Sequence, residues 1–155
     1  TNIELAVFGG SGSEHSQETF YKTHYFGHIS CDEQLRDVYS AADVMIVPSL
    51  QEAFGQTATE AMACGTPVVA FGATGLLDIV DHKQNGYLAS AFDEASLAEG
   101  IAWVLDAENS NDLRSQARTK AVKQFSNDWV AAQYLALYRS CFTQENPTPA
   151  EALAG

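Results

Sequence analysis

Short apolar runs, separated by more polar segments, dominate the first half of the chain. Residues 3–8, 24–26, 44–47 and 67–71 are such runs, and each is followed at once by glycine or proline. The run at 44–47 is hydrophobic at consecutive rather than alternate positions, which is typical of a strand buried on both faces of a sheet. The pattern therefore predicts four strands.

Helical patterns alternate with these strands. Residues 32–39 place acidic side chains in a first helical turn, where the helix dipole favours them. Residues 56–64 combine a face of small apolar side chains with Gly65, a residue typical of the position after a helix end. Strands that alternate with helices predict an α/β protein, with a Rossmann-like parallel sheet flanked by helices.

The pattern changes after residue 88, because helical periodicity continues there without strand signals, in the segments 94–105, 111–123 and 128–142. Ser126 offers a helix start, and aromatic residues such as Trp129 and Tyr134 lie at a spacing that predicts packing in a core. We expect one domain over residues 1–142 and a flexible, proline-containing tail at 143–155.

Composition and charge restrict the kinds of molecule that this chain could bind. Of the 155 residues, 46% are hydrophobic and 18% are charged, as in folded proteins with a core. A net charge of −12 disfavours nucleic acids and anionic membranes as partners. No apolar run approaches the roughly 18 residues of a membrane span. Three cysteines without a C-x-x-C pair predict no disulfide framework and no zinc site, and they fit a reducing compartment.

The segment after the third predicted strand carries the candidate chemistry, because parallel sheets bind ligands where strands end and helices begin. Gly55 would let a ligand approach the backbone closely, between Glu52 in the loop and Glu60 one turn inside the helix. Carboxylates accept hydrogen bonds from pairs of hydroxyl groups, as in ribose or a hexose. The amides that would face an anion between them are those of Phe54, Gly55, Gln56 and Thr57.

The spacing of two glutamates alone is weak, because Glu60 could be a solvated first-turn carboxylate and Glu52 an ordinary loop charge. The surrounding motifs are more specific: AADVMIVPS at 41–49, EAMACGTPVVA at 60–70, NGYL at 85–88 and QFSNDW at 124–129. Together with Glu52-AFGQTAT-Glu60, they resemble the C-terminal, donor-binding domain of the retaining family-4 glycosyltransferases with the GT-B fold, over nearly the whole chain.

The resemblance implies a role for each matching position. Glu52 would be the catalytic residue and would orient the donor sugar, and Glu60 would bind the ribose of a nucleotide-sugar. The amides of Phe54, Gly55, Gln56 and Thr57 would contact the diphosphate and the sugar, and the backbone around Ile29 would lie near the base. No metal ion and no cofactor are implied, since helix amides and cations would hold the anion.

The resemblance further implies an enzyme that moves a sugar from a UDP- or GDP-sugar to a glycan or lipid-linked acceptor, in bacterial polysaccharide biosynthesis. Because the chain starts at Thr1 inside a strand pattern, we expect a fragment, inactive by itself. The N-terminal domain that would bind the acceptor, and that would account for any peripheral membrane association, has no match here. Neither do the Arg and Lys that the family presents to the diphosphate.

Two other functions stay open at this point. The chain could be a non-catalytic scaffold or interaction domain that retains the fold, although a decayed site would be expected to lose at least one of Glu52, Gly55 and Glu60. It could also belong to another GT-B enzyme, such as a sugar-nucleotide epimerase, although the motif at 60–70 disfavours this. Asp78 stands where the family commonly has glutamate, which keeps the charge but shortens the reach.

Overall fold

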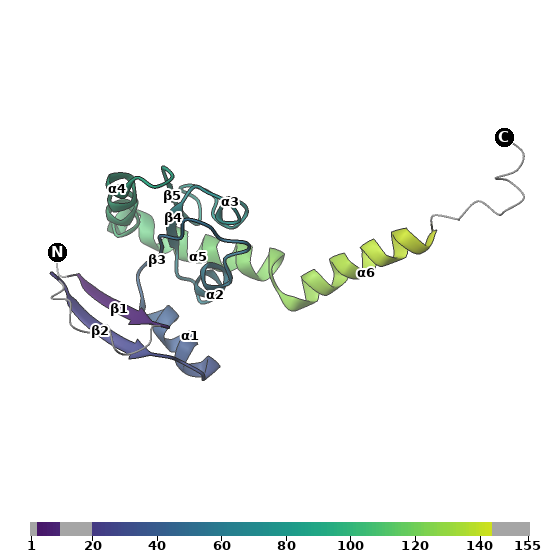
Figure 1. Cartoon of the computed structure of the whole chain (residues 1–155), viewed down its shortest axis with the longest axis horizontal. Coiled ribbons are helices and arrows are strands. Elements are labelled where there is room, and N and C mark those ends of the chain that lie inside the picture. Colours follow the sequence, from purple (N-terminus) through teal and green to yellow (C-terminus); the bar gives the residue numbers. More distant parts are fainter. Residues whose placement is uncertain (1–2, 10–19, 144–155) are drawn as a thin grey trace, which may run out of the picture. The chain divides into compact units, whose positions relative to one another are not determined.

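A computed structural model describes residues 3–9 and 20–143 of the chain (Figure 1). By its internal contacts the chain forms two compact units, residues 1–121 and residues 122–155, and we describe each by itself. The first unit holds all the strands and five helices within the described residues. The expected tail at 143–155 lies almost entirely outside the described residues.

The strands form two parallel sheets rather than the single sheet that was expected. In the first, β1 (Glu4–Phe8) pairs with β2 (Lys22–Gly27). In the second, the order is β3-β4-β5, with β3 at Met45–Val47, β4 at Val68–Phe71 and β5 at Gly86–Ala89. The parallel pairing throughout confirms the α/β prediction, and the four predicted strands lie at β1 to β4.

The strand β5 is absent from the sequence-based prediction, in which residues 85–88 appear only as the motif NGYL. Gly86 pairs with Val68 of β4 and comes so close to it that a Cβ at Gly86 would collide with the Val68 backbone. Asn85 is 2% exposed and bonds twice to Asp81, through both its amide oxygen and its amide nitrogen. A turn fixed by a buried side chain thus leads directly into an edge strand.

The helices of the first unit agree with the prediction, apart from a short one that it missed. The predicted helices correspond to α1 (Asp32–Ala41), α2 (Gln56–Ala63), α4 (Glu94–Val104) and α5 (Ala107–Gln124), which ends in the second unit. The missed helix is α3 (Leu76–Ile79), whose four residues are too few for a periodic signal. Gly65 adopts a φ of +80° directly after α2, as expected for a helix stop.

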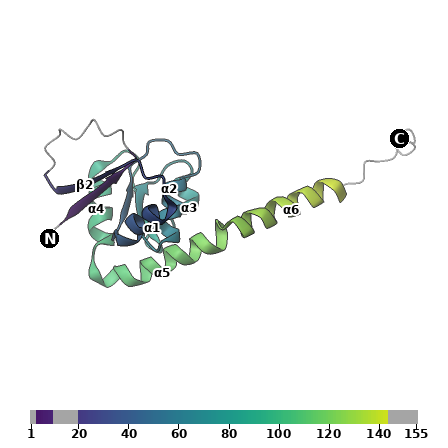
Figure 2. The same cartoon turned by 90° about the horizontal axis from the view of Figure 1, so that it is seen from below.

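The core lies around β4, whose four residues are all buried. Val69 packs with Val104 of α4 and Leu113 of α5, both at most 3% exposed. In Figures 1 and 2, α2 and α3 lie on one side of the three-stranded sheet and α4 lies on the other. A strand covered on both faces must be continuously apolar, which explains the pattern of β4.

Side chains of α5 bind the ends of two helices that precede it. Arg114 donates from Nη1 to the carbonyl of Ala42 at 3.1 Å and from Nη2 to that of Ser40 at 3.2 Å, at the end of α1. Arg118 donates to the carbonyl of Ala63, the last residue of α2. Positive charge at carbonyls without helical partners is favourable. Both guanidinium groups therefore help to hold α1 and α2 in place.

The described part of the second unit consists of the end of α5 and of α6 (Asn127–Thr143). The predicted start at Ser126 is confirmed, because its Oγ accepts from the amide of Trp129 at 3.3 Å. The expected packing of Trp129 and Tyr134 in a core is wrong, since they are 43% and 56% exposed. Within the described residues, no helix is both long and apolar enough to cross a membrane.

Candidate functional site

The candidate site is built on the start of α2, where Gly55 precedes the first helical residue. Gly55 is buried and has a φ of +88°, a conformation that side chains rarely adopt. A Cβ there would lie 2.9 Å from Ile79 Cδ1, 3.1 Å from Leu76 Cδ2 and 3.4 Å from Glu52 Cγ. Glycine is therefore required both by the backbone and by the space around it.

Glu52 is held at its backbone by the segment that precedes α3. Its amide donates to Thr74 Oγ1 at 3.0 Å, and its carbonyl accepts from the amide of Gly75 at 3.0 Å. A Cβ at Gly75 would lie 2.7 Å from the carbonyl oxygen of Ala53. The two loops thus pack backbone to backbone, which fixes the place from which the half-buried Glu52 side chain extends.

Glu60 is not the solvated carboxylate that the simpler interpretation would predict. It is half-buried, and each of its carboxylate oxygens accepts a hydrogen bond. Gln56 donates from Nε2 to Oε1 at 3.0 Å, and the hydroxyl of Tyr39 donates to Oε2 at 3.1 Å. Because Gln56 is the first residue of α2, its bond holds the Glu60 carboxylate toward the start of the helix. Glu52 borders Gly55 at the same end.

The Tyr39 hydroxyl remains protonated at this site. Burial of the phenol, together with the negative charge of Glu60 and the hydrogen bond to it, raises the pKa of Tyr39 far above its ordinary value. A protonated phenol donates its hydrogen bond to the Glu60 carboxylate, because an ionised carboxylate can only accept hydrogen bonds. Tyr39 is therefore a permanent donor to Glu60 across the physiological pH range.

The remaining predicted residues divide into two places. Phe54, Gln56 and Thr57 are exposed residues at the start of α2, on the surface of the first unit. The first turn of α2 itself contains no acidic residue. Ile29 is half-buried in the segment between β2 and α1, and not at the start of α2.

Two residues of this arrangement were missed by sequence reasoning. Tyr39 lies on the apolar side of α1, four residues after Leu35, and that spacing could have predicted a buried phenol in need of a partner. Thr74 has a φ of +51°, which is unusual for threonine, and no local signal points to its bond with Glu52. Both contacts join residues far apart in the sequence.

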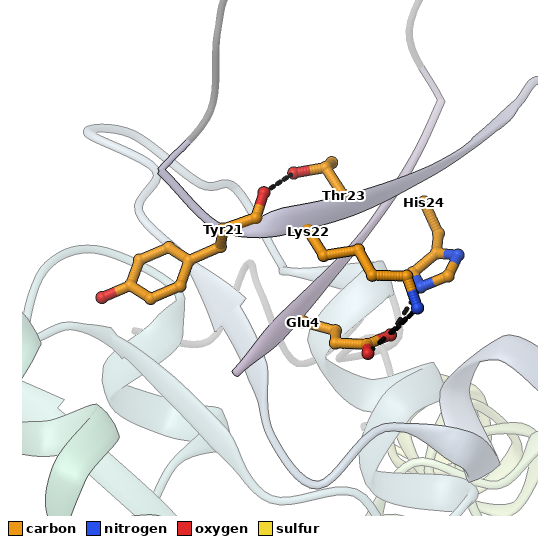
Figure 3. Close-up of polar contacts among 5 residues, drawn as sticks. All are labelled: Glu4, Tyr21, Lys22, Thr23 and His24. Carbon is orange, nitrogen blue, oxygen red and sulfur yellow. Dashed lines mark hydrogen bonds and ion pairs between the residues drawn. The ribbon is translucent and has the colours of Figure 1, made fainter. Parts of the chain in front are cut away.

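The cations that precede residue 110 contact groups other than the two glutamates. Lys22 and His24 of β2 both bond to Glu4 of β1, at 3.1 Å and 2.7 Å (Figure 3). Arg36 bonds to its neighbour Asp37, and the Lys83 ammonium lies over the rings of Tyr87 and Trp103, two aromatic side chains near β5. Among the described residues, no group of three or more His, Cys, Asp or Glu side chains could hold a metal ion.

Comparison with known proteins identifies the family. The model of the family described as "Glycosyl transferases group 1" matches residues 1–124. The match covers well over half of the chain, and the chain therefore belongs to this family. The α/β fold with parallel sheets flanked by helices agrees with that of GT-B glycosyltransferases among the solved structures.

Curated relatives share much of this chain. A D-inositol 3-phosphate glycosyltransferase of Mycolicibacterium smegmatis is 40% identical over 126 residues, which is 79% of this chain and 29% of the relative. An enzyme of the same name from Corynebacterium efficiens is 38% identical and is matched over 93% of this chain and 36% of its own length. The chain thus spans about a third of the length of these relatives.

Solved structures agree with the family assignment. A sucrose-phosphate synthase from Thermosynechococcus elongatus superposes with a TM-score of 0.70 and 38% identity, and the match covers 78% of this chain and 30% of the synthase chain. Anabaena Alr3699/HepE, solved in complex with UDP and glucose, superposes with a TM-score of 0.68 and 27% identity, over 77% of this chain and 32% of its own.

Proposed function

We propose that this chain is the donor-binding part of a retaining glycosyltransferase and that its ligand is a UDP-sugar. The observation that carries the proposal is that both glutamates are held at the start of α2, where Glu52 borders Gly55 and Glu60 accepts a hydrogen bond from Gln56. The similarity to Anabaena HepE, which was solved with UDP and with UDP-glucose, supports a uridine nucleotide. A GDP-sugar is the alternative ligand.

The start of α2 would bind the diphosphate. The first amides of any helix have no acceptors within that helix, and each favourable contact of an anion with the helix dipole contributes about 0.3–1 kcal/mol in addition to hydrogen bonds. Gly55 permits the φ of +88° with which the chain enters α2, because glycine has no Cβ to oppose that conformation. The amides assigned to this contact are those of Phe54, Gly55, Gln56 and Thr57.

The two glutamates would bind the sugars on either side of the diphosphate. Glu60 would accept hydrogen bonds from the ribose hydroxyls, and Glu52 would accept from the donor sugar and orient its anomeric carbon. The segment around Ile29 would lie near the base. In the whole protein the bond from the anomeric carbon to phosphate breaks while the acceptor oxygen bonds on the same face. The departing phosphate accepts the acceptor's proton, and the helix amides stabilise its charge.

The proposal extends to the role of the whole protein. We place it in the cytoplasm, in the transfer of a sugar to a glycan or lipid-linked acceptor of bacterial polysaccharide assembly, with the acceptor bound by residues outside this chain. A scaffold that has lost the activity would not be expected to retain Glu52, Gly55 and Glu60 in this arrangement. The 155-residue chain should bind donor nucleotide weakly and transfer no sugar.

Titration calorimetry with UDP and UDP-glucose tests the proposal, with GDP and GDP-mannose as alternative ligands. Glu60→Ala should weaken binding of the preferred nucleotide about tenfold or more, because hydrogen bonds to a charged group are lost. Glu99→Ala, which removes an exposed carboxylate of α4, is the matched control and should have no effect. Equal binding by wild type and Glu60→Ala would remove Glu60 from the site, and no nucleotide binding at all would contradict the proposed function.

A further inference from the structure

We propose that Tyr39 is a positioning residue that holds the Glu60 carboxylate for recognition of ribose hydroxyls, and that this contact makes the site selective for ribonucleoside diphosphates. The inference rests on the proposed function and adds a residue from α1, outside the motif that contains both glutamates. The bond from the Tyr39 hydroxyl to Glu60 Oε2, 3.1 Å long, joins residues 21 positions apart.

Tyr39 is itself fixed by its surroundings. The residue is 3% exposed, and its ring meets that of Phe8 edge-on, with 5.5 Å between the ring centroids. Its carbonyl accepts from the buried Thr66 Oγ1 at 2.6 Å and from the amide of Ala42 at 3.1 Å. A phenol held at its ring and at its backbone presents its hydroxyl in one place, so the hydrogen bond costs little further entropy.

The contact with Tyr39 also limits what the Glu60 carboxylate can accept. Tyr39 bonds to one carboxylate oxygen and Gln56 to the other. Each oxygen of a carboxylate can accept two hydrogen bonds, so one position remains on each. Two acceptor positions on one fixed, planar group match the two adjacent hydroxyls of a ribose. Without Tyr39 the carboxylate could rotate, and the match would be lost for part of the time.

Tyr39 remains a hydrogen-bond donor across the physiological pH range, because burial and the charge of Glu60 raise the pKa of the phenol. The contact is therefore a constant part of the site rather than a switch. A structural role alone would not distinguish ligands with ribose hydroxyls from ligands without them, and this difference provides the test.

The test compares UDP with 2′,3′-dideoxyuridine 5′-diphosphate, using the full chain and titration calorimetry. Tyr39→Phe keeps the ring and removes only the hydroxyl. It should weaken UDP binding about threefold to tenfold, the range of one lost hydrogen bond, and leave binding of the dideoxy analogue unchanged. Tyr87→Phe is the matched control, since Tyr87 is a half-buried tyrosine of β5 that packs on His82 and Trp103. It should change neither affinity.

A second variant protects the test against a folding defect. Gln56→Ala alters an exposed residue and removes the donor to the other oxygen of Glu60, so it should reproduce the same selective loss. Equal losses for both ligands, or no loss for UDP, in folded Tyr39→Phe would overturn the inference while the proposed function stands. Wild-type protein that binds both ligands equally would overturn it as well. Wild-type protein that binds neither UDP nor GDP would overturn the proposed function itself.

Discussion

Several glycines of the first unit stand where an added side chain would have no room. Gly55 faces the side chains of α3, Gly75 faces the carbonyl of Ala53, and Gly86 faces the backbone of Val68. In each case an added Cβ would come closer than real Cβ contacts do. Two of these glycines, Gly55 and Gly75, shape the loops around Glu52. At the scale of single residues, the candidate site thus depends on glycines, which leave room for close packing, as much as on the two glutamates.

Gly55→Ala should destabilise the protein by about 2–4 kcal/mol, because a positive φ and overpacking against Ile79 and Leu76 add up. Gly9→Ala separates the two effects. Gly9 has the same φ of +88° but nothing within 4 Å of an added Cβ, so its substitution should cost only about 1–2 kcal/mol. Urea denaturation followed by circular dichroism measures both. Equal losses in the two variants would show that Ile79 and Leu76 move aside freely.

At the scale of elements, α2 obtains its position from neighbours at both ends. The loop before it is bonded to Thr74 and Gly75, and the carbonyl of Ala63 at its end accepts from Arg118. Its eight residues are too few for a stable isolated helix in water. Tertiary contacts therefore stabilise and orient the helix that carries Glu60, although the sequence pattern predicts that the helix is present.

The pairing of β1 with β2 predicts a measurable effect on Glu4. Hydrogen bonds from His24 and then Lys22 lower the pKa of Glu4 (Figure 3). The ionised form is favoured in the folded state, so this contribution is present above the ordinary pKa of a glutamate and is lost as the pH falls through the lowered value. Carbon-13 NMR of the Glu4 carboxyl should show the lowered pKa directly.

His24→Ala should raise the pKa of Glu4 toward its ordinary value, because the largest cause of the shift is removed. His28→Ala is the control, since this exposed histidine follows the end of β2. An unchanged pKa in His24→Ala would show that Lys22 alone maintains the shift. A pKa in the wild-type protein at or above the ordinary value would contradict the contact itself.

At the scale of the whole molecule, the candidate site contains no residue of the second unit. All the residues assigned to the site lie between Ile29 and Thr74, within the first unit. The family match ends at residue 124, where α5 also ends. A chain that ends at Gln124 should therefore bind UDP within twofold of the 155-residue chain. Calorimetry on both chains, with circular dichroism to verify folding, checks this expectation. A large loss of affinity in a folded short chain would contradict it.

The net charge of −12 works against an anionic ligand over long distances. A site for a diphosphate on such a chain must rely on short-range donors, and the start of α2 supplies backbone amides without an acidic residue in its first turn. This is the physical reason why nucleotide binding by the chain alone is expected to be weak. Cations from outside the chain would strengthen it.

The sequence by itself determined the order of strands and helices, the start of α2 after Gly55 and the spacing of Glu52 and Glu60. These features are local, because they depend on periodicity and on residues within a turn or two of each other. Helix α3 and strand β5 escaped prediction, since both are short and β5 is defined by pairing with β4.

Only the tertiary structure decided how the two glutamates are held. Thr74 binds the Glu52 backbone from 22 positions away, and Tyr39 binds the Glu60 carboxylate from 21 positions away. Contacts of this kind arise when loops and helices of distant sequence pack together, and no local sequence pattern identifies the partner of either residue. The motif predicted which residues form the candidate site, whereas the contacts that hold these residues were visible only in the tertiary structure.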